Sequence, residues 1–201
     1  MRYLPSVVAV SFLSCGGLLS SISMADIGPY QANTSAFALA NFTDDSPQYL
    51  QLELSRRLGS KDYIGVEFIT WRYPAPLGIP YGQSFGDPAE EYPGTVRDIG
   101  VGLTWQHFYR KGFFTKVHAM PMMQRYSDTE NNHLQTGWQL FSTARVGYHF
   151  SWADDRFFIE PSVAATSWPI RTNVPETFAA LDAKWPGYFL FEPGLNIGMR
   201  F

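Results

Sequence analysis

The stretch that decides the fold is Tyr188-Phe189-Leu190-Phe191-Glu192-Pro193-Gly194-Leu195-Asn196-Ile197-Gly198-Met199-Arg200-Phe201. One side of this stretch is apolar and consists of Phe189, Phe191, Leu195, Ile197, Met199 and Phe201. The other side is polar or small and consists of Glu192, Gly194, Asn196, Gly198 and Arg200. Because successive side chains of a strand point to opposite faces, this period-two pattern predicts a β-strand whose apolar stripe ends on an aromatic residue.

Seven further segments alternate in the same way. They cover residues 34–43, 48–58, 62–73, 97–110, 112–126, 135–151 and 156–168, and the quoted stretch is the core of an eighth, 187–201. Most approach or exceed the ~9–11 residues that a tilted strand needs to cross a bilayer. Segment 34–43 fits a short amphipathic helix almost as well, but an even number of strands favours a strand there. Proline within three strands, at Pro121, Pro161 and Pro193, predicts local bulges because proline lacks a ladder donor.

The connections between these segments alternate in length. Residues 59–61, 110–112 and 153–155 are tight turns, 74–96 and 169–186 are long, and 127–134 is intermediate. Outer-membrane barrels have short periplasmic turns and long extracellular loops. We therefore expect an all-β chain that forms an eight-stranded antiparallel up-and-down transmembrane β-barrel, with Phe201 at the inner rim. A soluble sandwich or lipocalin-like barrel has the same alternation with its apolar face inward, and alternation alone does not separate the two.

Aromatic residues at the strand ends favour the membrane alternative, because two aromatic belts are typical of membrane interfaces. The outer ends carry Trp71, Tyr73, Tyr126, Trp138, Trp168 and Tyr188. The inner ends carry Tyr109, Tyr148, Phe150, Trp152, Phe157 and Phe201.

The first 25 residues read as an export signal, which leaves residues 26–201 as the barrel domain. Arg2 gives the positive start, residues 7–19 form an apolar core, and Ser23-Met24-Ala25 is a small-x-small cleavage site. A transmembrane anchor is one alternative, but the apolar run is shorter than the ~20 residues that a spanning helix needs. Cleavage as a lipoprotein at Cys15 is the other alternative.

Composition excludes several classes of protein. The 201 residues include 15 Lys and Arg against 18 Asp and Glu, and no basic stripe suggests a nucleic-acid partner. Cys15 is the only cysteine and falls in the signal, so we expect no disulfide and no thiol chemistry in the mature chain. A mean hydropathy of −0.15 rules out a helical membrane protein but fits a barrel with a polar lumen.

The polar faces of the predicted strands define an interior. An eight-stranded barrel is narrow enough for side chains to fill its lumen, and buried charges must pair. We expect a network of ion pairs and hydrogen bonds that fills the lumen, with a proton or ligand site and an open pore as alternatives. Its members are Glu53, Glu67, Lys116, His118, Arg145, Glu160, Glu192, Asn196 and Arg200.

The last long loop is the best candidate for a specific extracellular surface. Asn173 and Glu176 make a plausible capping pair for a short helix, with Pro175 in its first turn. The side chains expected on this loop surface are Arg171, Phe178, Leu181 and Trp185. The helix either covers the barrel as a lid or offers a surface for lipopolysaccharide or a partner.

No catalytic residue, metal site or cofactor is predicted. His149-Phe150-Ser151 resembles the His-x-Ser-Asn motif of outer-membrane lipid A deacylases, but Trp152 stands where that motif has asparagine. His149 and Ser151 also fall at the expected periplasmic end, away from outer-leaflet lipid. His118 and His133 have no ligand-type partners close in sequence.

The last quarter of the chain resembles a functionally uncharacterised group of bacterial outer-membrane barrels. The resemblance is carried by residues 156–162, Trp168-Pro169-Ile170, Asn173-Val174-Pro175-Glu176, Lys184-Trp185-Pro186 and residues 189–195. The whole region after residue 25 also resembles, in general pattern, the membrane domain of outer-membrane protein A. These resemblances imply the bacterial outer membrane, with outer-membrane lipid and lipopolysaccharide as partners. They also imply recognition by the barrel assembly machinery through the last strand, with Phe201 as its signal.

The expected function is a structural or surface-binding role in the outer membrane. A lipid A-modifying enzyme and a narrow channel for a small solute are the alternatives, and the sequence predicts no ligand and no oligomeric state.

Overall fold

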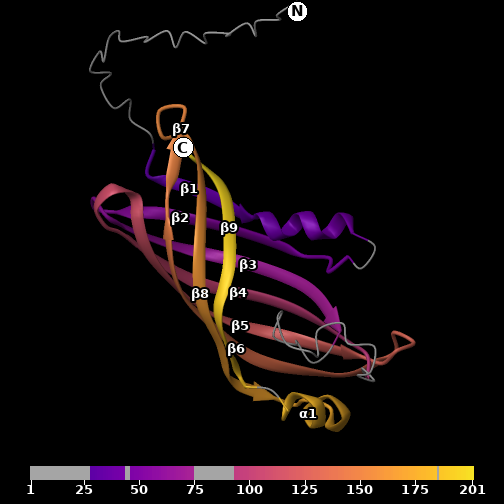
Figure 1. The fold of residues 1–201 in the computed structure, drawn as a ribbon. Helices are drawn as coiled ribbons and strands as arrows, with labels where there is room; N and C mark the ends of the chain where they lie inside the picture. Colours follow the sequence, from indigo (N-terminus) through magenta and orange to yellow (C-terminus); the bar gives the residue numbers. More distant parts are fainter. Residues whose placement is uncertain (1–27, 44–45, 75–92, 185) are drawn as a thin grey trace, which may run out of the picture.

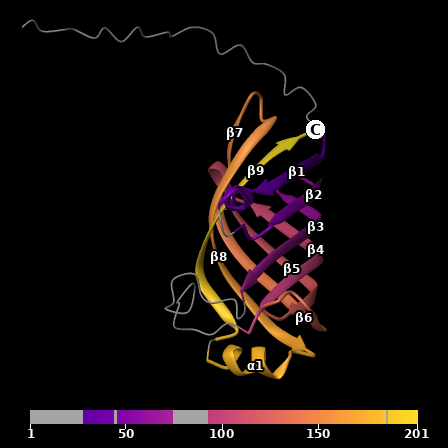
Figure 2. The ribbon, with the colours of Figure 1, turned by 90° about the vertical axis from the view of Figure 1, so that its right-hand side faces the viewer.

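One sheet of mainly antiparallel strands closes on itself in a ring of eight strands (Figures 1 and 2). The computed structural model describes residues 28–43, 46–74, 93–184 and 186–201. Within these residues, the predicted all-β fold and the predicted closure of eight strands are confirmed. The expected export signal, Cys15, most of the loop between residues 74 and 96, and Trp185 lie outside the described residues.

Strands that follow one another in sequence lie next to one another in the ring. They are β1 Tyr30–Ser35, β2 Leu50–Leu58, β3 Asp62–Pro74, β4 Thr95–Phe108, β5 Phe113–Ser127, β6 His133–Tyr148, β8 Phe157–Thr172 and β9 Tyr188–Arg200. Strand β7, Phe150–Trp152, follows β6 and pairs with the start of β8. The ring closes where β9 pairs antiparallel with β1. The described helices are the 3₁₀ helices η1 Ala36–Phe42 and η2 Arg110–Gly112 and the α-helix α1 Glu176–Asp182.

The prediction of a first strand at residues 34–43 is wrong. The strand lies earlier, at Tyr30–Ser35, and Ala36–Phe42 forms η1. The Ser35 side chain accepts a hydrogen bond from the Phe37 backbone N–H at 3.2 Å and so caps η1. Alanine at three of the seven helix positions also gives that segment little strand propensity.

The tight turns lie at one end of the ring, which we call the Phe201 end. Helix α1 lies at the other, the α1 end (Figures 1 and 2). The turn after β7 places Ala153, Asp154 and Asp155 in the left-handed region, with φ of 53°, 57° and 62°. The alternation of short and long connections therefore predicted correctly which strand ends meet at each end.

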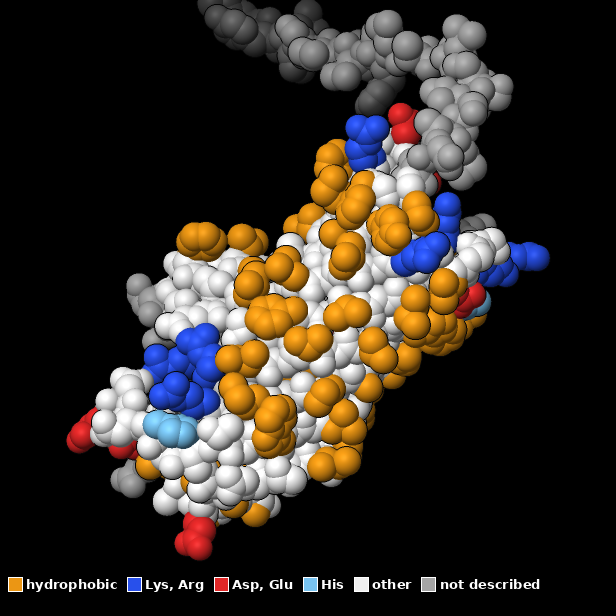
Figure 3. All heavy atoms as spheres, turned by 180° about the vertical axis from the view of Figure 1, so that it is seen from behind, with side chains coloured by type: hydrophobic (Ala, Val, Ile, Leu, Met, Phe, Trp, Pro, Cys, Tyr) orange, Lys and Arg blue, Asp and Glu red, His pale blue; other side chains and the backbone are white. Residues whose placement is uncertain are grey.

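The ring has a polar interior and an apolar outer wall. On β2, Gln51, Glu53 and Ser55 are 5% exposed or less, whereas Leu52 and Leu54 are more than half exposed. Hydrophobic side chains cover the wall seen in Figure 3, and Lys and Arg side chains gather near its ends. This polarity is the reverse of a soluble sandwich or lipocalin-like barrel, whose apolar face would be buried.

The aromatic residues predicted at the Phe201 end all lie exposed, from 38% for Tyr148 to 51% for Phe201. At the α1 end the prediction of an outward belt is wrong for Tyr73 and Tyr126, which are 8% and 3% exposed. Tyr73 and Tyr126 occupy inward positions of β3 and β5. The prediction is also wrong for Trp71 and Trp168, which line a cavity inside the ring, whereas Trp138 and Tyr188 are exposed on the wall.

A β-bulge reorients the start of β9. Ala164 pairs with Glu192 but Ala165 pairs with Leu190, so Phe191 is an extra residue, with φ of 62°. Phe189 therefore faces inward and is 8% exposed, although the sequence placed it on the apolar outer side.

The bulge expected at Pro193 is thus present two residues away. At Pro121 and Pro161 the prediction is wrong, because Pro121 pairs in register with Leu140 and Pro161 with Leu195. Another register shift lies at Phe141, opposite Trp168 and Pro169.

Candidate functional site

An aromatic plug fills the Phe201 end of the ring. Phe114 and Phe158 are completely buried. The Arg200 guanidinium carbon lies 5.6 Å from the centroid of the Tyr63 ring and 5.8 Å from those of Phe108 and Phe158. A cation within about 6 Å of several ring faces is stabilised by their quadrupoles. The predicted interior residue Arg200 therefore closes this end together with the rings.

A first polar layer lies against the plug. His149 Nδ1 is 2.8 Å from Glu160 Oε1, and its ring lies 4.8 Å from that of Phe158. Gln106 donates to the same Glu160 oxygen at 2.9 Å and accepts from Gln31 at 3.2 Å. These contacts join β1, β4 and β8 across the ring interior.

A buried ion pair forms the second layer. Lys116 of β5 pairs with Glu53 of β2, and both side chains are at most 6% exposed. Thr104 donates to Glu53 at 2.8 Å and Asn33 donates to it at 3.1 Å. The carboxylate therefore has partners from three other strands, as a buried charge requires.

A third layer contains a His–Glu pair. His118 Nδ1 lies 2.5 Å from Glu67 Oε2, and Gln51 donates to the other Glu67 oxygen at 2.5 Å. His118 Nε2 is buried and makes no hydrogen bond within the described part of the chain.

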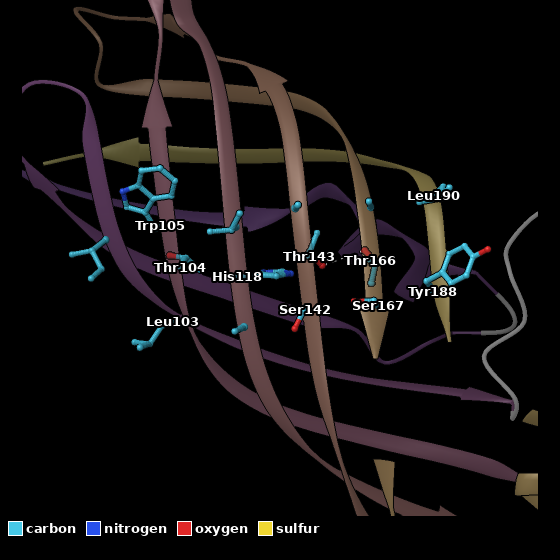
Figure 4. Close-up of a pocket in the computed structure, with 15 residues that line it drawn as sticks. Leu103, Thr104, Trp105, His118, Ser142, Thr143, Thr166, Ser167, Tyr188 and Leu190 are labelled. Atoms are coloured by element: carbon cyan, nitrogen blue, oxygen red, sulfur yellow. Dashed lines mark hydrogen bonds between the residues drawn. The ribbon is translucent and has the colours of Figure 1, made fainter. Parts of the chain in front are cut away.

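An Arg–Glu pair joins β6 to β9 near this layer. Arg145 donates to Ser162 at 3.0 Å and to Glu192 at 3.3 Å, and Thr166 donates to the other Glu192 oxygen. Figure 4 shows Thr104, His118, Thr143 and Thr166 in a row across neighbouring strands, with the Thr143–Thr166 hydrogen bond dashed.

The structure brings eight of the nine predicted interior residues into these layers and the plug. The ninth, Asn196, is 8% exposed and lines the cavity described next. Sequence reasoning missed Asp98, which is fully buried and accepts hydrogen bonds from Trp71, Tyr73, Gln124 and Gln139. Its even position on β4, shared with Thr104 and Gln106, was the available signal.

A cavity of about 580 Å³ lies next to the third layer, on the side that faces the α1 end. Its polar lining includes Glu67, His118, Arg145 and Glu192. Its apolar lining is formed mainly by Ile69, Trp71, Met122, Phe141, Trp168 and Phe189. The volume falls in the ~300–1,000 Å³ range of small-molecule sites, and the mixed lining suits an amphipathic ligand.

Helix α1 packs over part of the ring end. Phe178 is 1% exposed and packs with Tyr73, Val96 and Tyr126, its ring 5.0 Å from that of Tyr126. Phe178 therefore does not belong to an exposed loop surface. Of the other residues expected there, Leu181 is half-buried and Arg171 pairs with Asp182.

The capping pair predicted for this helix is wrong. Pro175 occupies the N-cap position, and the Asn173 side chain donates instead to the Thr136 backbone carbonyl at 2.5 Å. Burial raises the pKa of the Asp182 carboxyl, and the Arg171 guanidinium offsets part of that rise.

The outer wall carries two further features. A shallow hollow of about 700 Å³ is lined by Ala119, Ser142, Ala144, Ala165 and Ser167, with Leu103 and Trp105 on one side and Tyr188 and Leu190 on the other (Figure 4). Toward the α1 end, Arg72, Arg97 and Arg125 are direct cross-strand neighbours. We call these three residues the arginine row.

The resemblance to a deacylase motif gains no support from the contacts. His149 bonds to Glu160, whereas Ser151 donates to Asp155, so the two side chains do not form a nucleophile–base pair. Among the described residues, no cluster of His, Cys, Asp and Glu could hold a metal ion. No helix in this part of the chain is long and apolar enough to cross a membrane.

Comparisons with models of known protein families, with curated proteins and with solved structures each found no match.

Proposed function

We propose that this chain is an outer-membrane β-barrel protein with a structural or lipid-binding role at the bacterial surface. The proposal rests on how side chains are distributed, with charged ones inside the ring and apolar ones on its outer wall. Charged side chains such as Glu53, Glu67 and Lys116 are almost fully buried inside, while Leu52, Val101 and Leu103 are more than half exposed outside. In water this arrangement would expose a continuous apolar wall far larger than monomeric soluble proteins tolerate. Hydrocarbon is the solvent that such a wall requires, and the pairing of β9 with β1 closes the sheet into a ring.

The arginine row supports an anionic lipid as the partner at the α1 end. Like charges directly opposite each other on one face of a sheet repel. Arg72 donates to Thr95 and Asn131, and Arg97 donates to Gln48, but no carboxylate pairs with the row among the described residues. Lipid phosphate groups above an apolar wall would neutralise the row and accept bidentate hydrogen bonds. Lipopolysaccharide carries such phosphates in the outer leaflet.

Membrane fractionation tests the proposal. We expect the protein in the outer-membrane fraction, resistant to carbonate extraction, and migrating differently on gels with and without boiling. Recovery in the soluble periplasm, with no heat-dependent shift, would contradict it.

Replacing the arginine row tests the lipid partner separately. The triple variant Arg72→Gln, Arg97→Gln, Arg125→Gln should insert normally but lose salt-sensitive binding to vesicles that contain lipopolysaccharide. The double variant Arg56→Gln, Arg57→Gln at the Phe201 end serves as the control and should bind as the parent does. Equal binding by the two variants would remove the row from the proposal.

The closing strand is proposed to carry the assembly signal. Phe201 is exposed, its ring lies 6.2 Å from that of Tyr30, and its backbone exchanges two hydrogen bonds with Tyr30. We expect deletion of Phe201 to lower the heat-modifiable, assembled fraction without blocking export, as measured on cell envelopes. Substitution Tyr30→Ala removes the same ring contact and should leave assembly largely intact.

A further inference from the structure

The wall of the ring is interrupted beside β9. Strand β1 leaves the sheet after Ser35, whose partner on β9 is Asn196. The remainder of β9 toward the α1 end therefore has no partner strand on its β1 side. On the other side of β1, the strand pairs with β2 only from Tyr30 to Asn33. Helix η1 lies next to β9 where a strand would otherwise continue (Figure 1).

The interior cavity reaches this interruption. Its lining includes Ser35 at the end of β1, Phe37 of η1 and residues 193–195 of β9. Phe37 is 49% exposed and Leu195 is 41% exposed, so both belong to the outer surface of the molecule. The same cavity is lined by His118 and Arg145, deep in the ring. The cavity therefore opens sideways through the wall.

A series of aromatic side chains extends from the sideways opening into the interior of the strand ring. The Phe37 ring lies 4.9 Å from that of Tyr49, and the Tyr49 ring lies 6.3 Å from that of Trp71. Trp71 is followed along the lining by Ile69, Met122 and Phe141. These side chains provide a surface for one hydrocarbon chain.

The polar end of the cavity has donors to spare. The Arg145 guanidinium carries five N–H donors, of which one on Nη1 bonds to Ser162 and one on Nη2 bonds to Glu192. His118 Nε2 lacks a partner within the described residues, although the atom is buried. An oxygen-bearing head group with negative charge would accept charge-assisted hydrogen bonds from the remaining Arg145 donors.

We propose that this cavity binds a long-chain carboxylate that enters sideways from the membrane, with its carboxylate at Arg145 and its chain along the aromatic rings. The inference rests on the proposed membrane location, which supplies both the route and the apolar ligand. The protein would then hold a free fatty acid inside its wall.

Tryptophan fluorescence distinguishes the cavity from the outer wall. Trp71 lines the cavity, whereas Trp138 is 55% exposed on the wall. In phosphatidylcholine vesicles, two full-length variants retain only one of these tryptophans each, the others being replaced by phenylalanine. Stearate brominated at mid-chain should quench Trp71 saturably at low mole fraction. It should quench Trp138 only in proportion to its concentration in the bilayer.

The head-group assignment has its own variants. Arg145→Gln should weaken saturable quenching ~10-fold or more, as expected for loss of hydrogen bonds to a charged group. Arg110→Gln, an exposed arginine in the turn at the Phe201 end, should bind like the parent. The methyl ester of the same acid should also bind ~10-fold more weakly.

Three results would overturn the inference. Non-saturable quenching at Trp71 in a protein that is correctly inserted would remove the binding site. Equal affinity for acid and ester would exclude the carboxylate. Heat-modifiable migration is recorded on every sample, so failure of insertion is recognised before binding is measured. Equilibrium dialysis of the unsubstituted protein with radiolabelled palmitate repeats the measurement without tryptophan variants, and absence of binding there would also overturn it.

Discussion

At the scale of the residue, the buried Lys116–Glu53 pair illustrates how charges are tolerated inside the ring. Glu53 accepts from Lys116, Thr104 and Asn33, which lie on three different strands. The contacts from Lys116 of β5 and Thr104 of β4 link β2 to strands that are not its neighbours in the sheet, whereas Asn33 lies directly opposite Glu53 on the neighbouring strand β1. Removing one member leaves the other charged and buried, which is much more costly than removing both.

We expect Lys116→Met to lower the free energy of unfolding by about 3–5 kcal/mol. The double variant Lys116→Met, Glu53→Gln should recover a large part of that loss because no net charge stays buried. Urea unfolding in lipid vesicles, followed by tryptophan fluorescence, measures both. If the double variant is less stable than Lys116→Met, the pair is not the source of the loss.

At the scale of the element, helix α1 is held by one aromatic ring and one ion pair. Phe178 inserts between Tyr73, Val96 and Tyr126, and Arg171 pairs with Asp182 at the end of the helix. The Asp182 carboxyl is partly withdrawn from water, which makes the docking of α1 sensitive to pH.

The direction in which stability changes with pH follows from the raised pKa of the Asp182 carboxyl. A raised value in the folded state means that the contribution of this carboxyl to stability is fully present below its ordinary pKa of 3.8 and is lost as pH rises through the folded value. Relative to Asp182→Asn, the parent should therefore be less stable at pH 7 than at pH 4. The comparison is made by unfolding both proteins in vesicles at each pH, and a difference of opposite sign would contradict it.

Asp128 gives a control of opposite sign in the neighbouring turn. Hydrogen bonds from Asn132, with a further one from the Glu130 backbone, lower the pKa of its carboxyl. Its contribution is present above 3.8 and is lost as pH falls through the lowered value. Asp128→Asn should therefore lose stability relative to the parent at pH 7.

At the scale of the whole molecule, the ring is closed at one end and hollow toward the other. The aromatic plug and the first two polar layers lie along the axis between the cavity and the Phe201 end. We expect no discrete conductance steps when the protein is reconstituted in planar bilayers, with a porin measured alongside as the positive control. Regular steps that persist in the purified protein would favour a channel.

Much of the ring could be predicted from alternation, because an interior strand position is fixed by parity once one strand is oriented. That rule placed Glu53, Glu67, Lys116 and Glu160 correctly. The rule failed where a bulge shifts the alternation of side chains and where the chain leaves the sheet. The bulge at Phe191 turned Phe189 inward, and the Ser35 cap ended β1 early.

The cavity could not be read from the sequence for a related reason. The cavity depends on where β1 ends relative to β9 and on which aromatic side chains approach one another across the interior of the strand ring. Both are set by tertiary pairing, such as Ser35 with Asn196, and not by any local pattern.

The hydrogen-bonded pairing of Tyr30 with Phe201 also makes the molecule suitable for circular permutation. The two residues are adjacent across the seam of the ring, so a short linker could join them without disturbing the pairing of β1 with β9. New ends could be opened at the exposed Gly59–Lys61 turn. Such a permuted chain keeps every strand neighbour but moves Phe201 to the middle of the sequence. It would therefore separate the part that this residue plays in closing the ring from any part it plays as a terminal residue.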